Sequence, residues 1–182
     1  GANGYLIDQF LRESTNLRTD AYGGSPQNRI RFALEVVDAV AAEIGAGRTG
    51  IRLSPVSPAN DSAESQPQAV FGPLVEALSQ RGIAFIHFVE GSTGGPRDLT
   101  GFDFAWARQT FKGAYIANNG YTRDMAIDAI ASGRADAVAF GRAYISNPDL
   151  VQRLKANAPL AKAHSSTFYA PGPEGYIDYP AM

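Results

Sequence analysis

The sequence predicts an α/β protein built on a parallel sheet, with about four β/α units that amount to half of a closed eight-stranded barrel. Short apolar runs typical of strands alternate with amphipathic helical patterns, and this alternation favours parallel strands joined by helical crossovers. The chain has 182 residues, whereas a closed β/α barrel typically takes ~250. A small open doubly wound sheet is the rival architecture.

The first 25 residues are predicted to be loop. Asn3 and Tyr5 stand two residues apart between glycines, and the apolar run after them suits a loop that leaves a strand. The first helix is predicted from Ser25-Pro26 to Gly45, because a serine cap and a proline at the first turn favour a helix start and glycine favours a helix end. Apolar residues between these bounds recur every three or four positions.

A strand is predicted over residues 50–55. Ile51 and Leu53 share one face of this strand, and Arg52 and Ser54 share the other. If the apolar pair packs against helices, the guanidinium of Arg52 points toward the inside of the sheet or barrel and needs an electron-rich partner there. Two partners are open: an internal carboxylate, or a ligand that carries negative charge.

The remaining elements continue the alternation. A helix is predicted over 68–80, where Pro73 either kinks the helix or marks its start. The other expected elements are a strand over 83–89, a helix over 103–111, a strand over 115–117, a helix over 122–131, a strand over 135–140, a helix over 147–155 and an irregular tail from residue 163.

Composition argues against several classes of function. The chain has no cysteine, which rules out disulfides, thiolate metal sites and iron–sulfur clusters. The formal net charge is −2 without any block of Lys or Arg, so neither nucleic acid nor a membrane surface is an expected partner. No apolar run approaches the ~20 residues of a membrane span. We expect a cytoplasmic protein, and the absence of an initial methionine predicts a processed, cut or split polypeptide.

Ligands of parallel α/β folds bind at the carboxyl ends of the strands. Two successive strands end in Asn118-Asn119-Gly120 and in Gly141-Arg142, and each is followed within a few residues by a helix. Free backbone N–H groups and an arginine at such turns suit a phosphate group. The sequence therefore predicts a phosphate site here, although each motif alone is also compatible with an ordinary turn.

The other polar candidates are less specific. Asn3 and Tyr5 pair an amide donor with a phenol, although a tyrosine in a loop more often serves packing. His87 and His164 are isolated and have no second ligand at metal spacing, so no metal site is expected. We interpret His87 as a hydrogen-bonded strand residue.

Five motifs together closely resemble the Old Yellow Enzyme family of flavin-dependent ene-reductases: G-A-N-G-Y-L-I-D-Q-F-L, N-L-R-T-D-A-Y-G-G-S-P-Q-N-R, G-I-R-L-S-P, A-N-N-G-Y-T and A-D-A-V-A-F-G-R. The closest resemblance is to its bacterial branch of N-ethylmaleimide and nitrate-ester reductases. The resemblance implies a (β/α)8 TIM barrel that binds FMN, of which residues 1–182 are the C-terminal half with strands five to eight. It also implies that the tail, 163–182, packs near the flavin.

The resemblance also implies a role for each candidate residue. Tyr5 would protonate the substrate carbon, and Asn3 would hold the substrate's carbonyl or nitro oxygen. Arg52 would contact the pyrimidine edge of the flavin. Phosphate binding would fall to Asn118, Asn119, Gly120, Gly141 and Arg142, and the substrate side of the flavin would be lined by Phe168 and Tyr169.

One departure bears on partners. The family's histidine, which pairs with the residue at Asn3, would stand immediately before Gly1 and is absent. We therefore expect a complementary N-terminal half-barrel polypeptide, with which the chain uses FMN and NAD(P)H to reduce the activated C=C bonds of α,β-unsaturated carbonyl or nitro compounds. The alternative is a non-catalytic, self-associating half-barrel that retains only a phosphate site, and a different phosphate-binding barrel enzyme is the third possibility.

Overall fold

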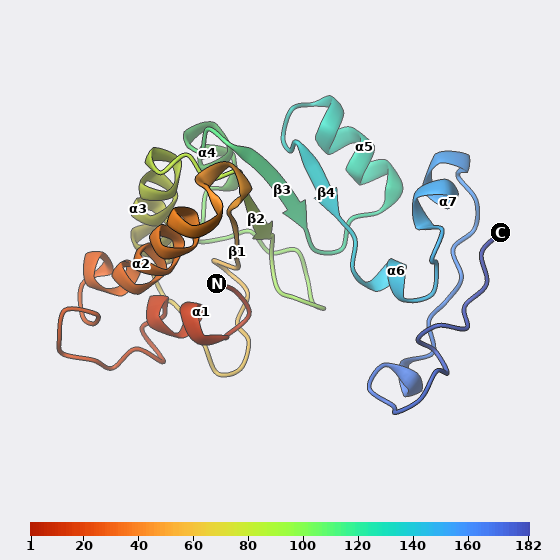
Figure 1. The fold of residues 1–182 in the computed structure, drawn as a ribbon, viewed down its shortest axis with the longest axis horizontal. Helices are drawn as coiled ribbons and strands as arrows, with labels where there is room; N and C mark the ends of the chain where they lie inside the picture. The colour runs from red at the N-terminus through yellow and green to blue at the C-terminus, as the bar shows by residue number, and fades with distance from the viewer.

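The computed structural model describes residues 1–182, and its centre is a four-stranded parallel sheet (Figure 1). The strands lie in the order β1-β2-β3-β4, so neighbours in space are neighbours in sequence. A doubly wound sheet reverses its strand order at a switch point, and this sheet does not. The arrangement is that of consecutive barrel strands, with β1 and β4 as open edges. Their bounds are β1 Gly50–Leu53, β2 Phe85–Val89, β3 Ala114–Asn118 and β4 Ala137–Ala139.

The predicted helices are present, and side-chain caps mark three of their starts. Ser25 accepts a hydrogen bond from the backbone N–H of Asn28 at 3.3 Å, and Thr122 and Asp103 cap later helices in the same way. The helical segments are α1 Leu6–Leu11, α2 Pro26–Ile44, η1 Ala46–Arg48, α3 Pro67–Gln80, α4 Phe104–Thr110, α5 Arg123–Ala131, α6 Arg142–Ile145, α7 Leu150–Ala156 and the short 3-10 segment η2 Ser165–Thr167.

Several boundaries differ from the prediction. The segment expected to be loop contains α1, and α6 follows β4 directly; both are too short to show an amphipathic period. The helix α3 starts with Pro67 in its first turn, so Pro73 lies inside it and does not mark its start. The last helix begins at Leu150, two residues after Pro148.

The strands alternate between a helix-covered face and an open face. Ile51 and Leu53 of β1 are buried under the helices, and Arg52 between them is exposed on the opposite face. Arg52 lies opposite His87 of β2, which places both on the open face. At the start of β1, Gly50 lacks a side chain where the ring of Phe85 lies, only 2.4 Å from the position that a Cβ would take.

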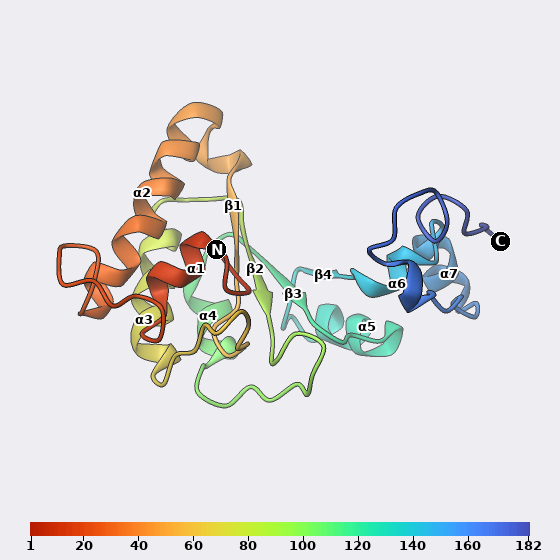
Figure 2. The ribbon, with the colours of Figure 1, turned by 90° about the horizontal axis from the view of Figure 1, so that it is seen from below.

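The core lies on the covered face, where α2, α3 and α4 pack side by side against the strands (Figures 1 and 2). The segment from α6 to the C-terminus extends away from this helical layer in both views. The open face and the strand ends are thus left for a site. None of the helices combines the length and the apolar character that a membrane crossing requires.

Candidate functional site

A cavity of about 1110 Å³ lies at the carboxyl ends of the strands. Its walls come from all four strands or the turns that follow them, from α6 and from the tail. The cavity is lined by eight residues that the sequence singles out: Arg52, Asn118, Asn119, Gly120, Gly141, Arg142, Phe168 and Tyr169.

A chain of hydrogen bonds crosses the strand ends on the open face. Arg52 donates from Nη2 to Oδ1 of Asn118 at 3.1 Å, and Nδ2 of Asn118 donates to the carbonyl of Ala139 at 2.8 Å. Arg52 makes no ion pair within the chain. The alternative that an internal carboxylate is its partner is therefore wrong. Partial burial lowers the pKa of its guanidinium from the ordinary value, but an arginine stays cationic at neutral pH. A fixed positive charge therefore faces the cavity.

The turns after β3 and β4 present free backbone donors. Asn119 and Gly120 have φ values of +100° and +69°, which turn the chain sharply at the end of β3. The backbone N–H groups of Gly120, Gly141 and Arg142 find no acceptor within the protein. Unpaired N–H groups in a concave site favour an anionic ligand.

The charge of the cavity lining points the same way. The side chains of Arg52, Arg142 and Lys162 line it, and no carboxylate does. The chain as a whole carries a net charge of −2, so the cavity departs in sign from the rest of the surface. The lining therefore suits an anion.

His87 also lines the cavity, which the sequence interpretation missed. We expected a hydrogen-bonded strand residue, but its Nε2 is shielded from solvent and has no partner. Burial and the charge of Arg52 lower the pKa of His87 to about 4, so the ring is neutral at physiological pH. The register of β1 with β2 explains its position, since Arg52 and His87 are paired.

Asn3 and Tyr5 lie outside the cavity lining; Asn3 contacts its rim, and Tyr5 follows two residues later. Asn3 has a φ of +57°, donates from its backbone to Oγ of Ser54 at 2.9 Å and donates from Nδ2 to Oγ1 of Thr93 at 2.7 Å. Thr93 itself lines the cavity. Tyr5 is 70% exposed, and its hydroxyl makes no hydrogen bond. The Tyr5 hydroxyl and the second amide hydrogen of Asn3 are thus free to meet a ligand, although the chain by itself does not enclose them.

A buried ion pair that sequence reasoning missed holds this rim segment in place. Asp8 of α1 and Arg12, which directly follows α1, are 0% and 1% exposed, and their side chains pair at 3.1 Å. Asp8 accepts from the backbone N–H of Gly4 at 2.9 Å, and Arg12 donates to the carbonyls of Ser54 and Pro55 after β1. The i, i+4 spacing of an acid and a base was its only signal in the sequence.

Phe168 and Tyr169 reach the cavity from the tail. Phe168 is 37% exposed, and Tyr169 is fully exposed. These two residues of the tail thus line the cavity with exposed aromatic rings.

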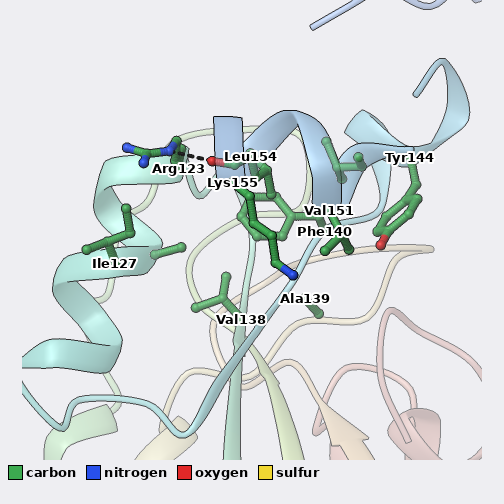
Figure 3. Close-up of a pocket in the computed structure, with 11 residues that line it drawn as sticks. Arg123, Ile127, Val138, Ala139, Phe140, Tyr144, Val151, Leu154 and Lys155 are labelled. Carbon is green, nitrogen blue, oxygen red and sulfur yellow. Dashed lines mark hydrogen bonds between the residues drawn. The ribbon is translucent and has the colours of Figure 1, made fainter. Parts of the chain in front are cut away.

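A second, apolar groove of about 620 Å³ lies between β4, α5 and α7 (Figure 3). Exposed apolar side chains such as Ile127, Tyr144 and Val151 line it, and Arg123 bridges its helices by donating to the carbonyl of Leu154 at 2.6 Å. None of the predicted site residues lies in this groove.

Comparison with known proteins agrees with the geometry. Residues 1–161 match the model of the NADH:flavin oxidoreductase / NADH oxidase family. The chain is 48% identical to 12-oxophytodienoate reductase 2 of Arabidopsis thaliana and 47% identical to a probable flavin mononucleotide-dependent alkene reductase of Leishmania infantum. All of the chain is covered in both comparisons, but only 50% and 49% of these relatives, so the chain spans about half their length.

Solved structures give the same proportion. The old yellow enzyme homologue of Zymomonas mobilis superposes with a TM-score of 0.92 at 42% identity, and morphinone reductase with 0.93 at 42%. Each match covers the whole chain and about half of the other protein, 52% and 49%. The four-stranded sheet thus corresponds to half of their barrel. The chain therefore belongs to the NADH:flavin oxidoreductase / NADH oxidase family, the family of the old yellow enzymes.

Proposed function

We propose that this chain is the C-terminal, FMN-phosphate-binding half of an ene-reductase barrel, which reduces activated C=C bonds with NAD(P)H once a complementary half-barrel completes it. The cavity at the strand ends carries this proposal. It gathers eight predicted flavin- and substrate-site residues from segments far apart in sequence, and its lining has cationic side chains without any carboxylate. Family membership and the names of the matched relatives support the same chemistry.

The residues present fit FMN. Free N–H groups of Gly120 and Gly141 and the guanidinium of Arg142 suit its phosphate. The unpartnered Nε2 of His87 and the cation of Arg52 lie together on the open face of the sheet, where they suit the polar edge of an aromatic ring system. Bound FMN would supply the hydride that reduces the substrate's β-carbon.

The side chains at the rim would complete the reduction. The phenol of Tyr5 is exposed and unpaired, so it can donate a proton to the substrate's α-carbon. Asn3 has two amide hydrogens, of which Thr93 takes one, and the other can bind the substrate's carbonyl or nitro oxygen. Phe168 and Tyr169 would cover the substrate from the tail side.

The sheet and its surroundings support the proposal of a complementary half. Both β1 and β4 have one unpaired edge, and open edges with apolar surface favour association. The apolar groove lies beside the open edge of β4 and exposes Ile127, Tyr144 and Val151. A second half-barrel that pairs with β4 would cover this groove, and the half-length match to relatives supports such a partner.

Reconstitution tests the proposal. The chain is mixed with a polypeptide that supplies the first four strands of a related barrel, together with FMN, and NADPH oxidation is followed with cyclohexenone as substrate. We expect turnover by the stoichiometric complex and none by either half alone. A folded, FMN-loaded complex that does not turn over would refute the enzymatic proposal.

The groove offers a separate test of association. Ile127→Glu should weaken binding of the complementary half at least tenfold, because it places a charge in an apolar contact. Val40→Glu is the matched control, since Val40 is an exposed apolar residue on α2, away from the groove. Equal affinity of both variants and the parent chain would contradict the groove as the contact.

The same open edges favour the second candidate, a self-associating half-barrel that keeps only a phosphate site. Sedimentation of the chain alone distinguishes the two. A stable homodimer that excludes the complementary half would favour the non-catalytic candidate.

A further inference from the structure

The turn after β3 is held from behind by a carboxylate to which the proposed chemistry assigns no role. Glu90 directly follows β2, is 6% exposed and does not line the cavity. Its Oε1 accepts from the hydroxyl of Tyr115 at 2.8 Å, and its Oε2 accepts from the hydroxyl of Tyr121 at 2.7 Å. Arg97 completes the set by donating from Nη2 to Oε2 at 2.7 Å. The buried carboxylate thus accepts three hydrogen bonds.

Arg97 and Glu90 both contact the backbone of the turn after β3. Arg97 donates from Nη1 to the carbonyl of Asn119 at 3.1 Å, and its guanidinium lies 4.2 Å from the centre of the Tyr121 ring. The backbone N–H of Glu90 donates to the carbonyl of Asn118 at 3.0 Å, and Nδ2 of Asn119 donates back to the Glu90 carbonyl at 2.8 Å. The turn is therefore bound to Glu90 through both main chain and side chain.

The conformation that these contacts hold is one that a free chain rarely adopts. Asn119 has a φ of +100° and is followed by Gly120 at +69°. A non-glycine residue in such a conformation persists only where its surroundings determine it. At the same turn the N–H groups of Gly120 and Tyr121 have no protein acceptor, and both residues line the cavity.

We propose that Glu90 is a positioning residue for anion binding. With Arg97 and Tyr121 it holds residues 119–121 in the conformation that presents their free N–H groups to a phosphate monoester in the cavity. Glu90 does not touch the phosphate itself, and its charge serves to fix Arg97 against the turn. The identification of this phosphate as that of FMN rests on the proposed function.

Glu90→Gln tests this positioning role. It keeps the size of the side chain and removes the negative charge that orients Arg97 and strengthens the hydrogen bond from Tyr121. We expect the affinity for FMN to fall about tenfold, as for the loss of one charge-assisted hydrogen bond. Affinity for riboflavin, which lacks the phosphate, should not change. Tyr121→Phe should change the ratio of the two affinities in the same direction by about threefold.

A matched control separates positioning from stability. Glu64 is another carboxylate with a fully buried side chain, and it pairs with Arg29 at 2.5 Å, away from the cavity. Glu64→Gln should destabilise the fold while leaving the ratio of FMN to riboflavin affinity unchanged. Flavin fluorescence measures both affinities on the full chain.

Backbone chemical shifts of Asn119 and Gly120 in the ligand-free chain give a second readout, since they report φ. In Glu90→Gln these shifts should move, and in Glu64→Gln they should not. Parent-like shifts together with a parent-like affinity ratio in both Glu90→Gln and Tyr121→Phe would overturn the role of Glu90. If the parent chain itself does not prefer FMN over riboflavin, the phosphate assignment fails, and the shifts alone then decide whether Glu90 orders the turn.

Discussion

Replacing Arg12 with methionine should cost this chain a large part of its stability. Arg12 is 1% exposed and pairs with Asp8, which is 0% exposed, while its other donors reach the carbonyls of Ser54 and Pro55. Arg12→Met keeps the alkyl contact with the ring of Phe71, 5.2 Å from the guanidinium, and removes only the charge and its donors. The change therefore isolates the polar part of the contact.

The magnitude follows from what the substitution leaves behind. Asp8 keeps one donor, the N–H of Gly4, and becomes a buried carboxylate without a counter-charge. Removing one partner of a buried ion pair costs about 3–5 kcal/mol of unfolding free energy. For a chain of this size each kcal/mol lowers Tm by ~2–4 °C, so we expect a fall of roughly 10 °C.

Two further variants sharpen the measurement, which is urea or thermal unfolding followed by circular dichroism. Arg18→Met is the matched control, because Arg18 and Asp20 form a pair whose side chains are 50% and 49% exposed, and such pairs contribute less than ~1 kcal/mol. Asp8→Asn combined with Arg12→Met should be more stable than Arg12→Met alone, since no unpaired charge remains. The reasoning fails if Arg12→Met unfolds like Arg18→Met, or if the double variant is no more stable than the single one.

Three other outcomes are expected. In the reconstituted enzyme, Tyr5→Phe should slow oxidation of the reduced flavin by an enone ~100-fold or more, while reduction of the flavin by NADPH is nearly unchanged. Equal slowing of both half-reactions would contradict proton donation by Tyr5. Arg142→Gln should weaken FMN binding about tenfold without changing riboflavin binding, and fluorescence titration that shows equal loss for both flavins would remove Arg142 from the phosphate site. The folded-state pKa of His87, about 4, lies below its unfolded value of 6.5, so the unfolded state gains the proton first and stability falls as pH drops from 6.5 to 4. Solvent screening of this half-buried ring limits that loss to about 1 kcal/mol, and His87→Gln should abolish this part of the pH dependence measured by urea unfolding.

Much of the architecture was predictable because its signals are local. The caps at Ser25, Asp103 and Thr122 each need only a hydrogen bond three residues along the chain, and all three helices begin where they were expected. The helix α1 was not predictable in the same way. It has six residues, and its fixed position depends on Arg12, which pairs with Asp8 and donates to a loop more than forty residues away.

Some cavity residues could likewise be predicted from local sequence, and others could not. Arg52 could be placed on the open face from the alternation of β1 alone, because Ile51 and Leu53 had to be buried. His87 needed one more fact, the register that pairs it with Arg52, and register is a property of two strands rather than one. The sequence shows a histidine in an apolar strand but not the neighbour that keeps it neutral.

The hydrogen-bond partners of Glu90 could not be predicted from any single strand. Its donors come from a loop, from β3 and from the start of α5's cap region, at positions 97, 115 and 121. No spacing rule connects these positions, but parallel strands bring their carboxyl ends to one edge, and an acid at the end of a buried strand must find donors there. The pattern is a carboxylate at the end of a buried strand, followed by an arginine and by tyrosines on the next strand and turn. We expect it to be worth testing wherever a ligand-binding turn contains residues with positive φ. In this chain it explains how Asn119, a non-glycine residue, is kept at +100° beside the cavity.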